Sequence, residues 1–512
     1  MLLLQLLSSY FLPFSFLLVF LFLYYSSFVN GKAPKNQPPS PPRLPIIGNL
    51  HQIGYYRYRS LQKLSQKYGP VMLLRFGSMP VLVVSSAEAA REVMKTQDLS
   101  FASRPSLIIN RKLLYDNKDV LFAPYGEYWR QMRSICVLHL LSKKRVETFS
   151  YVREEETAFL VEKIRKSCSS SSSVVVSLTD LLMQLTNNIM CRIALGSKYS
   201  GEEGRRKMNE LLSRVVELMG MNHVGDCIPW LGWINRVNGF DSEVDKVAKE
   251  MDEILEEVVQ ERIERNKRES HDCDEEGQDF LDILLEIQKN NTTGAPVHQN
   301  TVKAIILDMF GAGIDTTFSA LEWTMAEIVK HPDVMKKLQN EVREVAKGKP
   351  DITESDLEKF HYLKAVIKET LRFHCPVPLL APREAIQDTN VMGYNVKAGT
   401  QVIINAWAIT RDPSYWEDPE EFRPERFMNP DSSFDFRGQN FEYTPFGAGR
   451  RGCAGITLAT HILEYVLAKL VNEFNFSLPG NAGGESMDLR EVLGITIKMK
   501  KPLMVVATPR SI

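Results

Sequence analysis

The stretch from Val302 to Lys330 constrains the fold most, because apolar residues occupy nearly every side of a helix drawn through it. A helix that is apolar all round is buried on all sides. The chain from Glu88 to about Asn340 has mostly helical periodicity, and strand patterns occur only near its two ends. We therefore expect one large, mainly α-helical body with small β-sheets.

Strand patterns flank this helical region. Four runs rich in β-branched and apolar residues predict strands: Val71 to Phe76, Val81 to Val84, Asn390 to Ile404 and Gly494 to Val506. The first two surround the turn Gly77-Ser78-Met79-Pro80 and predict a hairpin. Two polar interruptions, Ser169 to Ser173 and Arg265 to Glu276, predict solvated surface loops.

The segment from Ala312 to Thr317 is unusual inside a helix. Gly311 and Gly313 each cost about 1 kcal/mol relative to alanine in a helix interior, and threonine can bond a preceding carbonyl and bend the helix. The segment indicates either a local groove that serves function or a structural kink alone.

The loop from Phe446 to Gly455 holds one cysteine among four glycines and two arginines. Cys453 directly precedes an apolar helical segment, so the helix N-terminus favours its thiolate, and Arg450 and Arg451 act in the same direction. The glycines let the backbone turn sharply and approach something flat. Cys453 is therefore a candidate metal ligand.

Two other interpretations of this loop stand beside that one. Gly447-x-Gly449-x-x-Gly452 fits a dinucleotide-binding fingerprint, but that motif needs a preceding strand, and Pro445 interrupts the segment before it. A helix-capping loop with an inert buried cysteine would explain the pattern if it stood alone.

The same loop has the pattern Phe-x-x-Gly-x-Arg-x-Cys-x-Gly and resembles the haem-binding loop of the cytochrome P450 family. Four further motifs in the family's order cover nearly the whole chain: Trp129-x-x-x-Arg133, Asp315-Thr316, Glu369-x-x-Arg372 and Pro424-Glu425-Arg426-Phe427. The stretch from Phe122 to Arg130 is similar to the plant subgroup that contains menthofuran and psoralen synthases. The resemblance implies the single-domain cytochrome P450 fold.

The resemblance also implies a haem b cofactor with Cys453 as its axial thiolate ligand. The cofactor-binding residues that it implies are Trp129, Arg133, Arg383, Phe446, Gly449, Arg451 and Gly455, and the guanidinium groups among them suit the haem propionates. It implies that Asp315 and Thr316 relay protons to dioxygen. It assigns the scaffolding of the haem loop to Glu369, Arg372 and Arg426.

The substrate pocket is expected from four largely apolar segments: Ser106 to Ala123, Ala304 to Thr317, Val377 to Ala381 and Leu493 to Thr496. Apolar walls indicate a lipophilic substrate. Two residues depart from the usual plant pattern, Ala454 after the ligand and Cys375 in place of a proline, and they bear only on pocket shape.

The reaction implied is an NADPH- and dioxygen-dependent monooxygenation of a plant specialised metabolite, with a terpenoid or a furanocoumarin as the first expectation. Electrons would come from a separate NADPH-cytochrome P450 reductase, because no flavin or NADPH domain is evident. Lys143-Lys144-Arg145, with Arg130, could face that partner. Three alternatives stay open. The enzyme could oxidise an alkaloid, or it could catalyse a haem-thiolate dehydration or rearrangement, for example of an aldoxime. The chain could also be a membrane-anchored electron carrier.

Charge and cysteine content exclude other classes. A net charge of -1 with evenly mixed signs argues against nucleic acid as a partner. The seven scattered cysteines form no C-x-x-C pair, which fits a reducing compartment without a disulfide framework.

The N-terminus predicts a membrane anchor. No charged residue occurs from Leu2 to Val29, and Lys32, Lys35 and Arg43 follow this run, so the positive-inside rule places the body in the cytosol. We expect a retained single-pass anchor over residues 1–30, in the endoplasmic reticulum, and a proline-rich linker over 31–50. The catalytic domain would cover 51–512.

Overall fold

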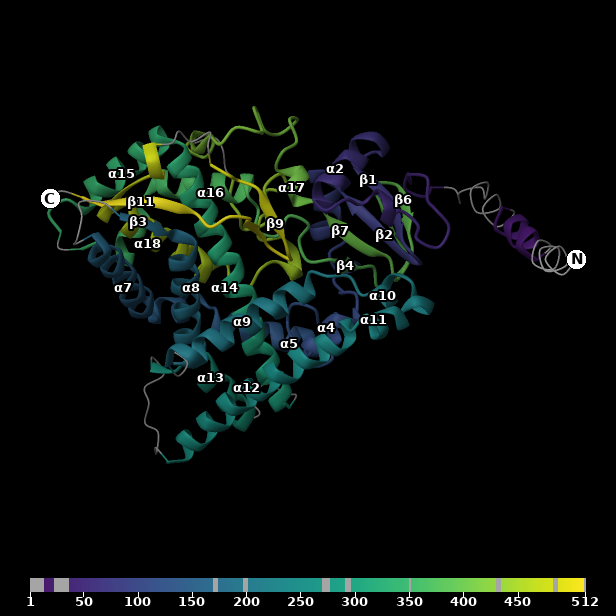
Figure 1. Cartoon of the computed structure of the whole chain (residues 1–512), viewed down its shortest axis with the longest axis horizontal. Helices are drawn as coiled ribbons and strands as arrows, with labels where there is room; N and C mark the ends of the chain where they lie inside the picture. Colours follow the sequence, from purple (N-terminus) through teal and green to yellow (C-terminus); the bar gives the residue numbers. More distant parts are fainter. Residues whose placement is uncertain are drawn as a thin grey trace, which may run out of the picture.

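The computed structural model describes residues 13–22, 36–168, 174–196, 201–268, 277–290, 296–349, 351–429, 434–481 and 487–510. Within these residues helices outnumber strands, and the strands form four small sheets. Figure 1 shows helices through the left and lower parts of the body and the largest sheet at the right. The predicted mainly α-helical fold with small β-sheets is confirmed.

The helices follow one another through most of the chain. The α-helices are α2 (Arg57–Tyr68), α3 (Ala87–Arg91), α4 (Ile108–Leu113), α5 (Glu127–Ile135), α6 (Lys143–Thr148), α7 (Ser150–Cys168), α8 (Leu178–Leu195), α9 (Gly201–Met219), α10 (Val224–Cys227), α11 (Trp233–Val237), α12 (Phe240–Arg268), α13 (Phe280–Asn290), α14 (Gln299–Lys330), α15 (Pro332–Ala346), α16 (His361–Phe373), α17 (Ala406–Ile409) and α18 (Ile456–Glu473).

Helix α14 lies in the middle of the body, as its apolar sequence predicts (Figure 1). Most of its side chains are buried, and it packs against α8, α16 and α18. Gly313 allows the close approach of α8, because a Cβ atom there would lie 2.7 Å from Cε of Met190. The helix continues without interruption through this glycine, which therefore serves helix packing.

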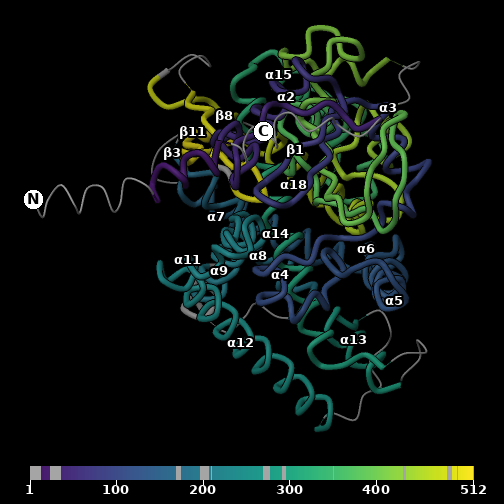
Figure 2. Tube along the Cα trace, turned by 90° about the vertical axis from the view of Figure 1, so that its right-hand side faces the viewer, coloured from purple at the N-terminus to yellow at the C-terminus, as the bar shows by residue number. Residues whose placement is uncertain are grey.

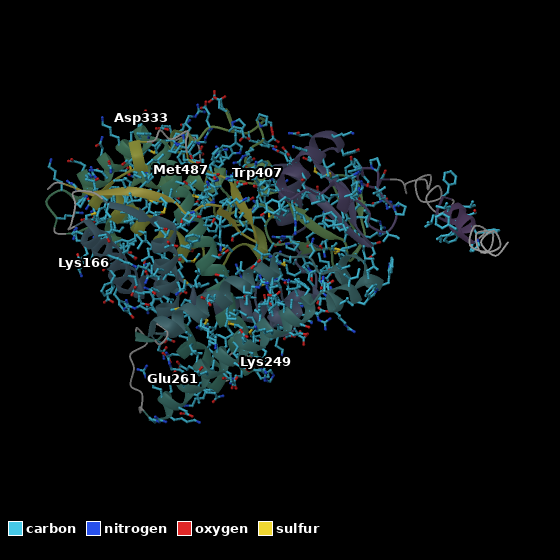
Figure 3. All side chains as sticks on the ribbon, viewed as in Figure 1. Lys166, Lys249, Glu261, Asp333, Trp407 and Met487 are labelled. Atoms are coloured by element: carbon cyan, nitrogen blue, oxygen red, sulfur yellow. The ribbon has the colours of Figure 1, made fainter. Side chains whose placement is uncertain are left out.

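Helix α12 extends away from the body at the bottom of Figure 2. Lys249 and Glu261 are exposed on it and project outward (Figure 3). The loop predicted from Arg265 begins later, because α12 continues to Arg268, which pairs with Glu264 at 3.3 Å one helical turn away. Residues 269–276 and the predicted loop at 169–173 lie outside the described residues.

The largest sheet has the strand order β1-β2-β7-β4. Its strands are β1 (Val71–Phe76), β2 (Met79–Val84), β7 (Gln401–Ile404) and β4 (Arg383–Glu384). The predicted hairpin is confirmed, but its turn is shorter than expected, because Met79 and Pro80 belong to β2. The pairing of β2 with β7 begins at Val81, so Pro80 lies at the strand start, where a missing N–H is tolerated.

The three other sheets contain the remaining strands. In one of them β11 (Met504–Pro509) is the central strand and pairs with both β3 (Val174–Ser177) and β8 (Phe474–Ser477). The other two pair β5 (Thr389–Val391) with β6 (Tyr394–Val396) and β9 (Glu491–Leu493) with β10 (Ile497–Met499). Strands predicted near 390–404 and 494–506 are confirmed. Strand β3 was not predicted, because its valines lie within a region of helical periodicity.

The described part of the N-terminal segment is the short helix Pro13–Phe22, whose large apolar side chains are exposed. Figure 1 draws this helix apart from the body. Among the described residues only α14 is long and apolar enough to cross a bilayer, and it is mostly buried in the protein. The rest of the predicted anchor lies outside the described residues. In the linker, the carbonyl oxygen of Pro39 accepts a hydrogen bond from Leu73 N at 2.9 Å, so this part of the linker packs on β1.

Candidate functional site

The loop that carries Cys453 ends where α18 begins. Gly455 is the N-cap residue of α18, and the backbone N–H of Cys453 donates to the carbonyl oxygen of Phe446 at 2.9 Å. The predicted position of Cys453 at a helix N-terminus is thus confirmed. Residues 441–446 form turns and contain no strand, so the dinucleotide-binding alternative lacks the strand that it requires.

Gly449 is required by a close contact within the protein. Its φ is +68°, and a Cβ atom there would lie 2.1 Å from the carbonyl oxygen of Met94 and 2.7 Å from Oδ1 of Asp98. At Gly455 an added Cβ would meet only Sγ of Cys453, at 3.9 Å. Packing therefore explains Gly449, whereas the freedom at Gly455 leaves one side of the cysteine uncovered.

The Cys453 side chain is accessible although protein surrounds it closely. Burial raises the pKa of the thiol. The backbone N–H of Gly455 and the guanidinium of Arg133 lower that pKa. Arg133 also donates from Nη2 to the carbonyl oxygen of Gly452 at 2.7 Å.

The expectation that Arg450 and Arg451 act on the Cys453 thiol is wrong, because both point elsewhere. The Arg451 guanidinium donates to the carbonyl oxygens of Ala102 and Ala123, each at 2.6 Å. Arg450 faces Asp98, to which its backbone N–H donates at 2.9 Å. Arg133, which lies far away in the sequence, is the cation beside the thiol.

Trp129 and Arg451 are stacked, with the guanidinium carbon 4.1 Å from the ring centre. The Trp129 Nε1–H donates to the carbonyl oxygen of Val120 at 3.0 Å. That segment is tied to α14, because Val120 N donates to Asp308 at 2.6 Å. Trp129 and Arg451 thus both hold the segment before α5. Their contact with the cofactor stays a prediction.

Arg383 and Arg104 complete a buried cluster of arginines. Arg383 donates to the carbonyl oxygen of Ala448 at 2.7 Å and pairs with Asp98 at 2.9 Å. Arg104 donates to the carbonyl oxygens of Leu121 and Ala381, and among the described residues no carboxylate pairs with it. Sequence reasoning missed Arg104, although an arginine just before the expected pocket segment at Ser106 was an available signal.

This cluster fits an anionic cofactor. Burial and the neighbouring arginines lower the pKa of Arg104, and burial lowers the pKa of Arg451 to about 9. Excess positive charge in an interior is costly unless an anion accompanies it. The carboxylates that face these arginines, Asp98 and Asp119, are fewer than the arginines. The two propionates of a haem would supply the missing negative charge.

Helix α14 contributes an accessible wall within an otherwise buried helix. Ala312 is exposed, and a Cβ atom on Gly311 would meet no atom within 4 Å. The Thr316 hydroxyl donates to the carbonyl oxygen of Ala312 at 2.6 Å. This part of α14 is therefore accessible, and the groove itself stays a prediction.

Asp315 is adjacent to Thr316 in sequence but faces another element. Its carboxylate forms an ion pair with Lys498 and accepts a hydrogen bond from the Thr496 hydroxyl. Successive helix positions differ by about 100°, so the two side chains of this pair point in different directions. The carboxylate therefore belongs to the contact between α14 and the β9–β10 hairpin.

Glu369, Arg372 and Arg426 come together as predicted. Arg372 binds Glu369 through two hydrogen bonds of 2.7 and 2.9 Å, and Arg426 Nε donates to the same carboxylate at 3.1 Å. Both charged side chains of the Glu369–Arg372 pair are fully buried. Arg372 also donates to the carbonyl oxygens of Thr410 and Pro419. A buried pair needs such complete hydrogen bonding.

Residues that directly adjoin two of the expected pocket segments contact each other. The backbone N–H of Ile497 donates to the carbonyl oxygen of Pro376 at 2.9 Å, which joins the hairpin to the segment before Val377. Cys375, beside Pro376, is fully buried, and burial raises the pKa of its thiol to about 12. It is therefore a neutral packing residue.

Comparisons with known proteins agree with this geometry. A family model for cytochrome P450 matches residues 38–505. The chain is 51% identical over 476 residues to (+)-menthofuran synthase from Mentha piperita, covering 93% of this chain and 94% of that protein. It is 52% identical over 493 residues to norfluorocurarine oxidase from Strychnos sp, covering 96% of each.

A third relative and a solved structure extend the comparison. Tabersonine/lochnericine 19-hydroxylase from Catharanthus roseus is 50% identical over 486 residues, which cover 94% of this chain and 95% of that protein. A zebra fish cytochrome P450 solved with abiraterone has a TM-score of 0.74 and 27% identity, and covers 89% of this chain and 100% of that chain.

Proposed function

This chain belongs to the cytochrome P450 family, and on that premise we propose which residues carry its reaction and which substrates it oxidises. It is a monooxygenase with a haem cofactor ligated by a cysteine thiolate, and its electrons come from NADPH through a reductase. The observation that carries the assignment of residues is the accessible Cys453 thiol just before the N-terminus of α18.

The haem would be held between this loop and the arginine cluster. Cys453 would supply the axial thiolate, with Phe446, Gly449 and Gly455 shaping the loop around it. Arg104, Arg133 and Arg383 would face the propionates, while Trp129 and Arg451 fix the adjoining segment. When bound, the haem activates dioxygen for insertion of one oxygen atom into an unactivated C–H bond.

Proton delivery would fall to Asp315 and Thr316. The Thr316 hydroxyl lies in the accessible wall of α14 and can hold a proton at Oγ1. The Asp315 carboxylate, held by Lys498 and Thr496, would resupply that proton from the hairpin side.

The substrate proposed is a lipophilic plant specialised metabolite, and the most direct support is the apolar character of the expected pocket segments. Relatives about half identical to this chain are named for menthofuran, norfluorocurarine and tabersonine, which directs attention to terpenoids and alkaloids. A furanocoumarin belongs in the same test.

The proposal can be tested in microsomes that contain this protein and a plant reductase. They are incubated with a mixed panel of terpenoids, alkaloids and furanocoumarins, with and without NADPH. Mass spectrometry is expected to find a product with one added oxygen that depends on NADPH. A product formed without NADPH and without added oxygen would replace monooxygenation by a dehydration or rearrangement. Reduced haem that binds no carbon monoxide would favour electron transfer.

Anchoring is proposed through residues 1–30 in the endoplasmic reticulum membrane, with the linker over 31–50 and the catalytic domain over 51–512 in the cytosol. Exposed apolar side chains on the helix Pro13–Phe22 and the later cluster Lys32, Lys35 and Arg43 support this arrangement. Deletion of residues 1–30 should release the protein from carbonate-washed microsomes. Continued membrane retention of that deletion variant would contradict the proposed anchor.

The reductase is proposed to dock near α5 and α6. Lys143 and Lys144 are exposed at the start of α6, and Arg130 is exposed on α5, the helix that also carries Arg133. An acidic partner surface would be attracted to these cations.

A further inference from the structure

The β9–β10 hairpin is attached along one side of α14. The Ser319 hydroxyl and the Trp323 Nε1–H both donate to the carbonyl oxygen of Ile497, at 2.6 and 3.2 Å. One turn away, Glu322 accepts a hydrogen bond from the backbone N–H of Met499 at 3.2 Å. Three helix positions thus bind the backbone of β10.

Asp315 is the fourth position, and it binds side chains of the hairpin. Lys498 forms an ion pair with Oδ1, and the Thr496 hydroxyl donates to Oδ2. Thr496 and Lys498 are two residues apart, so in an extended chain they lie on one face. Among the described residues no other side chain bonds the Asp315 carboxylate, which is only 8% exposed.

The same hairpin connects Asp315 to an accessible side chain and to neighbouring segments. The Lys498 side chain is 29% exposed, so it joins an accessible position to a buried carboxylate. At the hairpin turn, a Cβ atom on Gly220, just after α9, would lie 3.1 Å from Gly494 and Ile495. Ile497 also bonds Pro376. The turn therefore packs against the end of α9, and the strand that follows it is bonded to the residue just before the expected pocket segment at Val377.

We propose that Thr496 and Lys498 are positioning residues for the Asp315 carboxylate, so that the hairpin sets how well protons are delivered. The inference rests on the proposed function, because a proton-delivering carboxylate is needed only if dioxygen is reduced there. Thr496 and Lys498 act through Asp315.

The first test compares the variants Lys498→Met and Thr496→Val with their conservative counterparts Lys498→Arg and Thr496→Ser. Misplacement of a catalytic group by about 1 Å can cost up to about 100-fold. We expect product formed per NADPH consumed to fall by about 10-fold or more in the first two variants. In turnovers that form no product, two electrons from NADPH and two protons reduce dioxygen to hydrogen peroxide instead. The conservative variants should restore most of the coupling.

Lys500→Met is the matched control, because Lys500 is an exposed lysine at the end of the same hairpin. Its coupling should equal that of the wild type. Wild-type coupling in Lys498→Met and Thr496→Val would overturn the proposal. If the wild type itself forms no NADPH-dependent product, the proposed function fails, and amide hydrogen exchange then decides whether Asp315 and the hairpin are coupled.

A second readout needs no turnover. Amide hydrogen exchange of residues 491–499 is measured in the purified wild type and in Asp315→Asn, because that substitution removes the charge that Lys498 faces. We expect exchange in β9 and β10 to accelerate by about 10-fold, since local opening becomes less costly. The Lys500→Met control should exchange as the wild type does. Unchanged protection in Asp315→Asn would show that this carboxylate does not hold the hairpin, and would overturn the proposal.

Discussion

Arg133 on α5 donates from Nη2 to the carbonyl oxygen of Gly452, the residue directly before Cys453, over 2.7 Å. The same guanidinium lowers the pKa of the Cys453 thiol. One side chain thus fixes the loop that presents the sulfur and supplies the positive charge beside it. Among the described residues no other hydrogen bond occupies this guanidinium, so the rest of its fork would suit the proposed contact with a haem propionate.

Replacement of Arg133 should weaken haem retention. Arg133→Met removes the bond to Gly452 and the charge, while Arg133→Lys keeps the charge without the planar fork. A hydrogen bond to a charged group contributes about 1.5–3 kcal/mol, which corresponds to a roughly 10- to 100-fold change in affinity. The rate of haem transfer to a scavenger protein should rise from wild type to Arg133→Lys to Arg133→Met. Equal rates in all three proteins would contradict this role.

Gly449 should tolerate no side chain. An added Cβ would lie 2.1 Å from the Met94 carbonyl oxygen, a backbone atom that cannot turn aside. Gly348 has a similar φ of +74° but faces open space, so it is the matched control. We expect Gly449→Ala to lose most bound haem, measured by its absorbance per protein. Gly348→Ala should keep its haem and lose only about 1–2 kcal/mol of stability through its backbone conformation. Equal haem content in both variants would refute the packing argument.

The stability of the protein should depend on pH through His331. Glu327 is buried and accepts hydrogen bonds from His374 at 2.7 Å, and its Oε2 lies 3.3 Å from Nδ1 of His331. The bond to Glu327 raises the pKa of His331, and the histidines hold the pKa of Glu327 well below its usual value. Because folding raises the pKa of His331, its bond to Glu327 stabilises the folded protein fully at a pH below 6.5, the ordinary pKa of histidine in an unfolded chain. This stabilisation is lost as the pH rises through the pKa of His331 in the folded protein.

The urea midpoints of wild type and His331→Asn, measured from about pH 6 to about pH 9, test this linkage. The difference between the two proteins should be largest at the acidic end and shrink as the pH rises. A difference that grows with pH would reverse the sign and contradict the interpretation.

Charge reversal on α6 should slow electron delivery. The double variant Lys143→Glu/Lys144→Glu is expected to lower reductase-supported turnover several-fold, and more so at low salt, because the attraction is screened by ions. Haem content should not change. Lys249→Glu on the distant helix α12 (Figure 3) is the control and should turn over normally. Normal turnover of the double variant would place the docking surface elsewhere.

Local sequence patterns predicted the features that depend on neighbouring residues. The apolar run of α14, the start of α18 after Cys453 and the i, i+3 pair of Glu369 and Arg372 all follow from helical spacing. The structure confirms each of them. The resemblance to a known family supplied the roles of these residues.

Contacts between distant segments were not predictable from such patterns. The sequence does not reveal that Arg133 rather than Arg451 faces Cys453, or that Arg104 joins the arginine cluster. The Asp315 carboxylate meets Thr496 from 181 residues away. Tertiary packing decides these partners, and spacing within one element carries no information about them.

The most direct test of the account is the carbon monoxide difference spectrum of the reduced protein, recorded for the wild type and for Cys453→Ser at equal protein concentration. Cys375→Ser, at a cysteine that is buried, serves as the control. The account predicts the spectrum of a thiolate-ligated haem in the wild type and in Cys375→Ser, and its loss in Cys453→Ser. A thiolate-type spectrum that persists in Cys453→Ser would contradict the assignment of Cys453 as the axial ligand.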